Sequence, residues 1–295
     1  MKIRLAMISM VSVFLLVLAG CGGANGAGDQ TPAEASEEKG TIVFGMSEWT
    51  STEAPTAIMK LILEEAGYNV QYTKAEQPVL FLGMKNKEID FFMDAWLPYT
   101  EAVLWSEYEN DLVKVATSYE QAPLGWVVPT YVEENSIPEL IGNAEKFEGQ
   151  IVGLSAGSGM TETSKQMIED YGLDGFKYVE TGEAAMMAEA KRKIMSEKPI
   201  LFLGWRPHSM FSQYDLKFLE DPEGYFQYDN VYVISYKGIE EAHPEAYDIV
   251  SKWSIDVADL EEMMYKYETD GTSFEDLAKE WVANHRDKVD AMLGK

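Results

Sequence analysis

Apolar and polar positions follow the same order of patterns twice between residue 41 and residue 207. In each copy, short runs of mainly apolar residues, typical of buried strands, alternate with stretches that carry apolar residues at helical spacing. The first copy predicts a strand at 41–45, a helix at 55–66, a strand at 68–73, a helix at 78–87 and a strand at 89–95. The second copy predicts a strand at 150–154, a helix at 160–170, a strand at 176–180, a helix at 183–196 and a strand at 199–204. Both copies end in Trp-x-Pro, at 96–98 and at 205–207.

This alternation predicts an α/β protein with two similar lobes, each a mostly parallel sheet flanked by helices. Ligands of such sheets bind beyond the carboxyl ends of the strands, so a ligand cleft is expected between the lobes. The expected first lobe is 41–129 plus 232–295 and the second is 130–231, with extended crossings near 125–131 and 230–234. The helical tail from about residue 243 is expected to pack on the first lobe and to turn near Gly271.

Residues 1–20 have the parts of a secretory signal: two basic residues, an apolar stretch and small residues before Cys21. The apolar stretch is shorter than the roughly 20 residues that cross a bilayer. The run Leu18-Ala19-Gly20-Cys21 resembles a bacterial lipobox, which implies a lipid on Cys21 and a protein held at the extracytoplasmic face of the cell membrane. The alternative is an ordinary signal peptide with a chance cysteine. Residues 21–40, poor in groups to bury, are expected to form a flexible tether.

Charge and composition narrow the classes of partner. The chain has 50 acidic against 24 basic residues, a formal charge of −26. Such a surface repels nucleic acid and anionic lipid headgroups, so neither is an expected partner. Cys21 is the only cysteine and the three histidines are dispersed, so no disulfide and no metal site are expected. We expect no cofactor, and we expect a monomer.

The seven tryptophans fall into two groups. Four lie in apolar or helical stretches and are expected to pack in the core: Trp105, Trp126, Trp253 and Trp281. Trp49, Trp96 and Trp205 instead follow strand ends on the expected cleft face. For each of these three tryptophans alone, packing in the core is as good an explanation as ligand contact. Their positions at equivalent strand edges of a repeat favour contact with a common ligand. Three indole faces suit a quaternary ammonium, because its charge is spread over methyl groups that cannot donate hydrogen bonds.

A glycine-rich loop at 157–161 precedes the first helix of the second copy. Glycine lets the backbone approach a ligand closely, and a helix N-terminus offers unpaired N–H groups and the positive end of the helix dipole. The backbone of this loop and helix start is therefore a candidate carboxylate site, with Ser158, Thr161 and His208 as candidate further donors. The alternatives are an ordinary glycine-rich helix start and a structural histidine.

Four motifs taken together carry a family resemblance. They are Asp94-Ala95-Trp96-Leu97-Pro98, Ala122-Pro123-Leu124-Gly125 with Val128-Pro129-Thr130-Tyr131-Val132, Gly157-Ser158-Gly159-Met160, and Gly204-Trp205-Arg206-Pro207-His208-Ser209-Met210-Phe211. From residue 41 onward the chain thus resembles the substrate-binding lipoproteins of glycine betaine ABC importers. The resemblance implies a type II periplasmic-binding-protein fold, a cage of Trp49, Trp96 and Trp205, and carboxylate capture by the backbone of Gly159 and Met160. It also implies closure on the ligand and delivery to a membrane permease driven by a cytoplasmic ATPase.

One position departs from the family pattern. Several relatives read Trp-Leu-Pro-x-Thr-His, and that histidine helps to hold the ligand carboxylate, whereas this chain has Glu101 there. A carboxylate at Glu101 repels a ligand carboxylate unless it is protonated, turned away or shielded. Choline, another methylated amine and an altered betaine pose therefore stay open beside glycine betaine. Arg206 is a candidate to offset the charge of Glu101.

A serine hydrolase is the rival class. Residues 153–157 match the nucleophile-elbow pattern between an expected strand and an expected helix, with Ser155 as the nucleophile. His208, His243 or His285 could complete a triad. The repeat accounts for the same loop, so binding without turnover is the expected behaviour.

Overall fold

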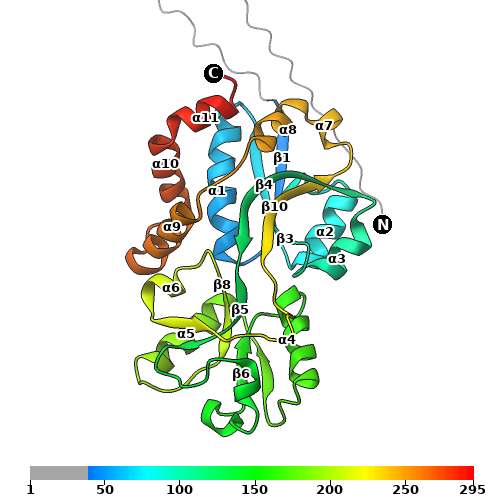
Figure 1. Cartoon of the computed structure of the whole chain (residues 1–295). Coiled ribbons are helices and arrows are strands. Elements are labelled where there is room, and N and C mark those ends of the chain that lie inside the picture. The colour runs from blue at the N-terminus through cyan, green and yellow to red at the C-terminus, as the bar shows by residue number, and fades with distance from the viewer. Residues whose placement is uncertain (1–38) are drawn as a thin grey trace, which may run out of the picture. The chain divides into compact units, whose positions relative to one another are not determined.

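A computed structural model describes residues 39–295. The expected signal peptide, Cys21 and almost all of the expected tether lie outside these residues. These residues belong to one compact unit, which contains two five-stranded sheets, one in each lobe (Figure 1). The expectation of an α/β fold with two lobes is therefore confirmed.

The first lobe is built from both ends of the described chain. Its leading part comprises β1 (Thr41–Met46), α1 (Thr50–Glu65), β2 (Asn69–Lys74), α2 (Gln77–Lys85), β3 (Phe91–Leu97), α3 (Ala102–Tyr108) and β4 (Leu112–Ala122). Its final part comprises β10 (Asp229–Tyr236), α7 (Ile239–Ala242), α8 (Pro244–Ser251), α9 (Val257–Asp270), α10 (Phe274–Asn284) and α11 (Arg286–Met292). The strand order is β2-β1-β3-β10-β4, and only β10 runs against the other four strands.

The second lobe is the continuous middle of the chain. It comprises β5 (Leu124–Pro129), two short 3-10 helices (Ile137–Leu140 and Ala144–Phe147), β6 (Gln150–Gly153), α4 (Gly159–Asp170), β7 (Lys177–Glu180), α5 (Glu183–Ile194), β8 (Phe202–Trp205), α6 (Met210–Gln213) and β9 (Leu216–Phe218). The strand order is β7-β6-β8-β5-β9, and here only β5 runs against the other four. Both sheets are thus mostly parallel, as expected.

The internal repeat is confirmed in the topology. The series β1-α1-β2-α2-β3 in one sheet matches β6-α4-β7-α5-β8 in the other. Both Trp-x-Pro motifs also carry a cis peptide bond before the proline. The largest difference in a boundary is at α1, which begins at Thr50 rather than near Pro55. The turn in front of Pro55 is held by the Ser51 and Thr52 hydroxyls, which both donate to Asp94.

The crossings between the lobes lie earlier in the chain than expected. Strand β5 pairs with β8 and β9 of the second sheet, although it was expected to end the first lobe. The break falls at Pro123, between β4 and β5. Proline has no N–H and cannot continue a strand ladder, and Gln121, two residues before it, has a left-handed φ of 56°. The return crossing likewise precedes Asp229, where β10 already belongs to the first sheet, and not residue 232.

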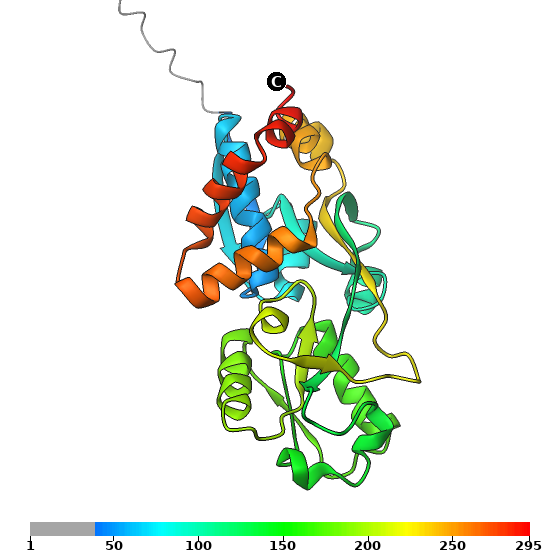
Figure 2. The same cartoon turned by 60° about the vertical axis from the view of Figure 1, so that its left-hand side comes forward.

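The helical tail packs on the first lobe, as expected. Helices α9 and α10 lie against α1, and α8 lies against β4 (Figure 2). The turn between α9 and α10 is at Gly271, whose φ of 70° is the left-handed conformation that glycine adopts without strain. The predicted turn position is therefore confirmed.

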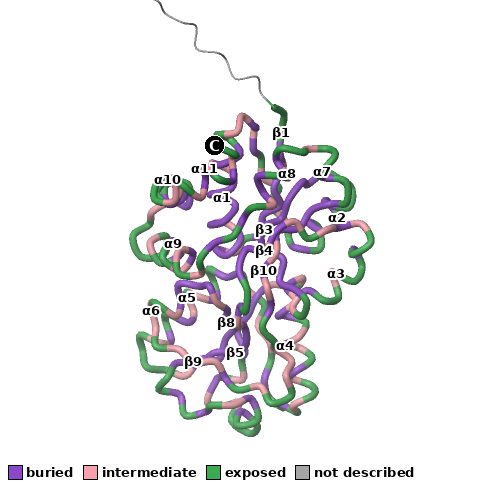
Figure 3. Tube along the Cα trace, turned by 45° about the horizontal axis from the view of Figure 1, so that its top comes forward, coloured by how far each residue is buried: buried purple, intermediate pink, exposed green. Residues whose placement is uncertain are grey.

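The core follows the two sheets. The strands β3, β5 and β8 are buried along their length, whereas the outer turns of the helices are exposed (Figure 3). Of the four tryptophans expected in the core, three are buried: Trp126, Trp253 and Trp281. The fourth, Trp105, is partly buried against the core. Within residues 39–295, no helix combines the length and the apolar character that a membrane crossing requires.

Candidate functional site

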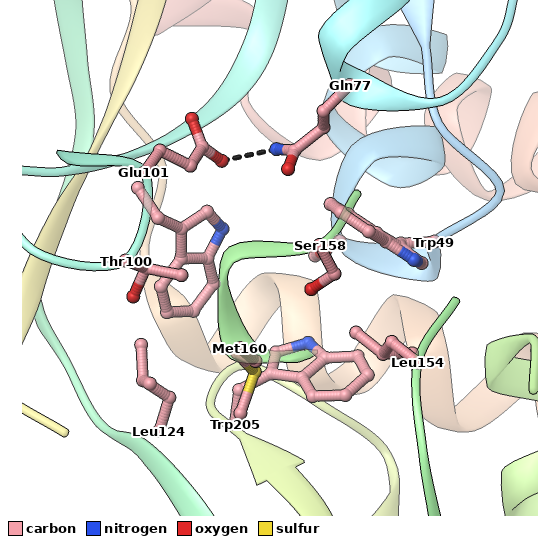
Figure 4. A pocket seen from close by; sticks show the side chains of 11 residues that line it. Trp49, Gln77, Thr100, Glu101, Leu124, Leu154, Ser158, Met160 and Trp205 are labelled. Atoms are coloured by element: carbon pink, nitrogen blue, oxygen red, sulfur yellow. Dashed lines mark hydrogen bonds between the residues drawn. The ribbon is translucent and has the colours of Figure 1, made fainter. Parts of the chain in front are cut away.

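A pocket lies between the two lobes and is lined by both of them (Figure 4). Its lining residues are Trp49, Ser51, Gln77, Trp96, Thr100, Glu101, Leu124, Leu154, Ser158, Met160 and Trp205. Glu101 is the one ionisable side chain among these described residues. The pocket therefore offers aromatic and apolar surface, a few neutral polar groups and no side-chain cation.

The three tryptophans that were expected at the cleft are brought together here. Trp49 immediately precedes α1, Trp96 lies near the end of β3, and Trp205 is the last residue of β8. All three indoles line the pocket, and Figure 4 shows Trp49 and Trp205 at its wall. Parallel strands end at one edge of a sheet, so the ends of β3 and β8 present their tryptophans to the same gap between the lobes.

Asp94 fixes the orientation of Trp96. The Trp96 Nε1–H donates to Asp94 Oδ1 over 2.8 Å, and Asp94 Oδ2 accepts the hydroxyls of Ser51 and Thr52 at 2.8 and 2.7 Å. Residues two apart on a strand share one face, which places Asp94 beside Trp96. Burial raises the pKa of Asp94, and the three donors oppose that rise. The carboxylate thus ties the indole to the start of α1.

Trp205 is supported from behind by His208. The two rings meet edge to face, with centroids 4.8 Å apart and an interplanar angle of 88°. His208 Nδ1 accepts the amide N–H of Met210 at 3.0 Å, so its proton is on Nε2, which donates to Glu183 over 3.2 Å. His208 is 1% exposed and does not line the pocket. The sequence suggested His208 as a ligand donor, but both ring nitrogens are already used within the protein.

The sequence predicted that the ligand carboxylate binds at the N-terminus of the helix that is now α4. The start of α4 does line the pocket. Ser158 and Met160 line the pocket, and Gly159 lies between them. Gly159 and Met160 are the first two residues of this 12-residue helix, so their N–H groups have no helical acceptor. A Cβ on Gly159 would lie 1.9 Å from the Thr100 carbonyl oxygen of the other lobe. Glycine therefore allows the two lobes to meet at this point.

Glu101 lines the pocket beside Gln77, and the two side chains hydrogen-bond, with the Gln77 amide donating to Glu101 Oε1. Glu101 Oε2 is buried and has no hydrogen-bond partner. Burial raises the pKa of Glu101 well above its usual range, and the charges of Asp94 and Asp229 act in the same direction. Arg206 was expected to offset this charge, but its guanidinium pairs instead with Glu261 over 2.9 Å.

Several contacts hold the lobes together around the pocket. Glu183, the first residue of α5, accepts the Thr50 amide N–H at 3.1 Å and the Thr50 hydroxyl at 2.7 Å. Thr50 is the first residue of α1 in the other lobe, so an anion sits at the positive end of that helix. Arg206 and Glu261 also join the second lobe to α9 of the first. These bonds exist only while the lobes are closed on each other.

Removing the Glu183 carboxylate is expected to weaken ligand binding about fivefold to thirtyfold, because closure loses about 1–2 kcal/mol of buried hydrogen bonds. The variant is Glu183→Ala, and the measurement is calorimetric titration with glycine betaine. Glu189→Ala is the matched control: it lies on the same helix but pairs within its own lobe with Arg192. Affinity within twofold of the wild type for Glu183→Ala would contradict a role in closure.

The geometry of a serine hydrolase is not formed at Ser155. Its hydroxyl donates to Glu76 at 3.1 Å, and no histidine contacts it within residues 39–295. His208 is bonded to Glu183, while the other two histidines lie near Asp90 and Asp259. Among the same described residues, no cluster of histidine, cysteine or acidic side chains could hold a metal ion.

Sequence reasoning missed five of the lining residues: Ser51, Gln77, Thr100, Leu124 and Leu154. Leu124 and Leu154 read as ordinary core positions, and an isolated serine, threonine or glutamine carries no pattern of its own. Gln77 is 2% exposed, although it begins a helix with proline in its first turn, which suggests a surface position. Only the fold brings these residues to Trp96. Ser51 alone had a usable signal, because it is close to Trp49 in the sequence.

Comparison with known proteins identifies a family. Residues 40–284 match the family described as "Substrate binding domain of ABC-type glycine betaine transport system". Over 148 residues the chain is 36% identical to the glycine betaine/carnitine transport binding protein GbuC of Listeria monocytogenes, a match that covers 49% of each protein. The matched region therefore spans about half the length of that relative.

Solved structures agree over most of the chain. Lactococcal OpuAC, in its closed conformation complexed with glycine betaine, has a TM-score of 0.81 and 30% identity, covering 86% of this chain and 99% of OpuAC. An ABC-transporter choline-binding protein in complex with choline has a TM-score of 0.82 and 25% identity, covering 86% and 91%. With the two-lobed fold, the pocket between the lobes and a family match over 40–284, this chain belongs to the substrate-binding domains of ABC-type glycine betaine transport systems.

Proposed function

We propose that this protein is the extracytoplasmic solute-binding protein of an ABC importer and that it captures glycine betaine or a related methylated ammonium osmolyte. The observation that carries the proposal is the pocket in which Trp49, Trp96 and Trp205 converge from both lobes. The relatives support the solute class, because GbuC is a glycine betaine/carnitine binding protein and OpuAC was solved with glycine betaine.

The indole cage would hold the ammonium end of the ligand. A quaternary ammonium cannot donate hydrogen bonds, so it loses little when its methyl groups leave water for aromatic faces. Each face contributes about 0.5–2 kcal/mol by cation–π attraction, with the larger values in desolvated sites. The buried Asp94 accepts from Trp96 Nε1 and so places carboxyl oxygens behind one wall of the cage. The pocket lining offers no cation that would repel the ligand.

The start of α4 would hold the carboxylate end. The N–H groups of Gly159 and Met160 lie at the positive end of that helix, and Ser158 adds a hydroxyl at the pocket wall. A ligand that touches the indoles of β3 and β8 and the amides of α4 joins the two lobes. Such a ligand favours the closed state, because it makes the full set of contacts only there.

The proposed role in an importer also implies which partners the protein has. The closed, loaded protein would deliver its solute to a membrane permease driven by a cytoplasmic ATPase, and it would act as a monomer. Cys21, which lies outside the described residues, would carry the lipid that holds the protein at the membrane. The order of basic, apolar and small residues before Cys21 supports this anchor.

A choline-type cation binder is the second candidate. Glu101 favours it, because an ionised carboxylate in the pocket would attract a cation and repel a ligand carboxylate. The choline-binding protein solved with choline is also among the similar structures. The two candidates differ in whether the ligand needs a carboxylate.

Calorimetric titration with a panel of solutes tests the proposed function. We expect saturable binding of glycine betaine and of at least one of proline betaine, carnitine, choline and trimethylamine N-oxide. Glycine is the control, because it keeps the carboxylate but replaces the methyl groups with N–H donors for which the indole cage has no acceptor. Absence of binding for every methylated solute, or equal binding of glycine, would overturn the proposal.

A further inference from the structure

Glu101 is a buried carboxyl group with an unused oxygen at the ligand pocket. It is 3% exposed, and its Oε1 accepts the Gln77 amide while its Oε2 has no partner. A buried polar atom without a partner costs free energy, and an ionised carboxylate costs more than a neutral acid. Such an oxygen in the wall of a pocket is therefore either protonated or supplied with a hydrogen-bond partner by a bound ligand.

Two neighbouring carboxyl groups have the donors that Glu101 lacks. Asp94 accepts three hydrogen bonds, from Trp96 Nε1 and from two hydroxyls of α1. Asp229 accepts the amide N–H groups of Tyr99 and Thr100 at 2.7 and 2.9 Å. Donors of this kind stabilise the ionised form, whereas Glu101 receives a single neutral amide. Of these three carboxyl groups, Glu101 thus has the fewest donors to stabilise a negative charge.

The groups that face Glu101 from the surrounding elements contain no cation. Gln77 of α2 is neutral, Asp94 of β3 and Asp229 of β10 are acidic, and the Glu101 amide N–H donates to the Trp96 carbonyl. Within residues 39–295, Glu101 makes no ion pair with lysine, arginine or histidine. Burial and the two acidic neighbours together raise its pKa well above the usual range, so the surroundings favour the uncharged acid.

Glu101 also lies at the carboxylate end of the pocket. Gly159 packs on the carbonyl oxygen of Thr100, the residue before Glu101, so the start of α4 and Glu101 flank the same part of the pocket. Figure 4 shows the hydrogen-bonded Glu101–Gln77 pair above Thr100, Ser158 and Met160 in this view. The terminal torsion of a glutamate is broad and roughly two-fold, so one oxygen can accept from Gln77 while the other turns to a ligand.

We propose that Glu101 is the specificity-determining residue of this pocket, and that as a neutral acid it donates a hydrogen bond to the carboxylate of a methylated ammonium zwitterion. The inference rests on the proposed function and names the ligand class within it. An O–H donor to a carboxylate forms a charge-assisted hydrogen bond, the strong kind, and choline has no carboxylate to receive it. The pocket therefore selects betaines over choline.

Proton uptake on binding follows from this role. Closure over a ligand carboxylate raises the pKa of Glu101 above its value in the open protein, because burial and a second negative charge both disfavour the ionised form. Between these two pKa values the complex holds one proton more than the free protein. Affinity is then highest below the lower pKa and falls up to about tenfold for each pH unit of increase through the interval.

The test is calorimetric titration of the purified protein with glycine betaine and with choline from about pH 5 to about pH 8, in buffers of different ionisation enthalpy. We expect tighter binding of glycine betaine than of choline, uptake of up to one proton with glycine betaine, and affinity that falls as the pH rises. Glu101→Gln keeps a neutral donor, so it is expected to bind glycine betaine without proton uptake and without pH dependence. Glu107→Gln, an exposed position on α3, is the matched control and should keep the wild-type pH dependence.

Three outcomes would overturn the inference. They are pH-independent binding of glycine betaine by the wild type, tighter binding of choline than of glycine betaine, and loss of choline binding in Glu101→Gln, which would make Glu101 an ionised partner of the cation. Each of these leaves the proposed function standing, because a methylated solute still binds. Failure of every solute to bind would overturn both. Thermal unfolding of Glu101→Gln checks that the variant is folded.

Discussion

Replacing Trp96 or Trp205 with alanine is expected to weaken binding of glycine betaine at least about tenfold, since each lost indole removes about 0.5–2 kcal/mol of cation–π attraction in addition to apolar contact. Both side chains are almost fully buried, at 6% and 3% exposure, so the ligand meets them in a desolvated setting where the attraction is strongest. Phenylalanine keeps an aromatic face of smaller size. Trp96→Phe should therefore lose less affinity than Trp96→Ala in the same calorimetric titration.

Trp105→Ala is the control for this prediction. Trp105 is a partly buried tryptophan of α3 that does not line the pocket, so its loss should leave the affinity within about twofold of the wild type. Circular dichroism and thermal unfolding show whether each variant is folded. Unchanged titrations for both Trp96→Ala and Trp205→Ala would exclude the indole cage as the site of ammonium binding.

Gly159→Ala is expected to reduce affinity for glycine betaine about a hundredfold or more, because overpacking against a fixed group costs roughly 3 kcal/mol when neither side can yield. The added Cβ would lie 1.9 Å from the Thr100 carbonyl oxygen, which belongs to the backbone of the other lobe. The clash exists only when the lobes close, and alanine is favourable at the start of a helix. The unliganded variant should therefore unfold at the wild-type temperature while ligand no longer raises that temperature.

Gly182→Ala provides a matched control for Gly159→Ala. Gly182 precedes α5 as Ser158 precedes α4, and a Cβ there would meet no atom within 4 Å. Ligand should therefore stabilise Gly182→Ala as much as the wild type, by the same rise in melting temperature. Full ligand stabilisation of Gly159→Ala would contradict the view that close approach of the lobes at this glycine is needed for binding.

The sequence was informative wherever the structure depends on local periodicity. Apolar spacing located the strands and helices of both copies, and the repeat placed Trp96 and Trp205 at equivalent strand ends, where the pocket is found. The position of the turn at Gly271 was likewise predicted, because glycine after a helical stretch is a local signal. Predicting these features requires only the hydrophobic period of each element and the rule that ligands bind at strand ends.

Other features depend on which segments meet in space. The chain crosses between the lobes at Pro123, whereas the sequence placed the crossing near 125–131, because periodicity does not say which sheet a strand joins. His208 and Arg206 are close to Trp205 in the sequence, yet their side chains are used by Glu183 and Glu261, which lie far away along the chain.

Glu101 shows most clearly which properties follow from the sequence and which follow only from the tertiary structure. The sequence determined that an acidic residue follows the Trp-Leu-Pro motif, and it left open whether that acid is charged. Its protonation depends on burial, on Gln77 from α2 and on two acidic neighbours from β3 and β10, all of which the tertiary structure brings together. The sequence by itself thus determined the elements and the aromatic walls of the site. Only the tertiary structure decided how charge is distributed around them, because solvation and long-range contacts leave no local pattern in the chain.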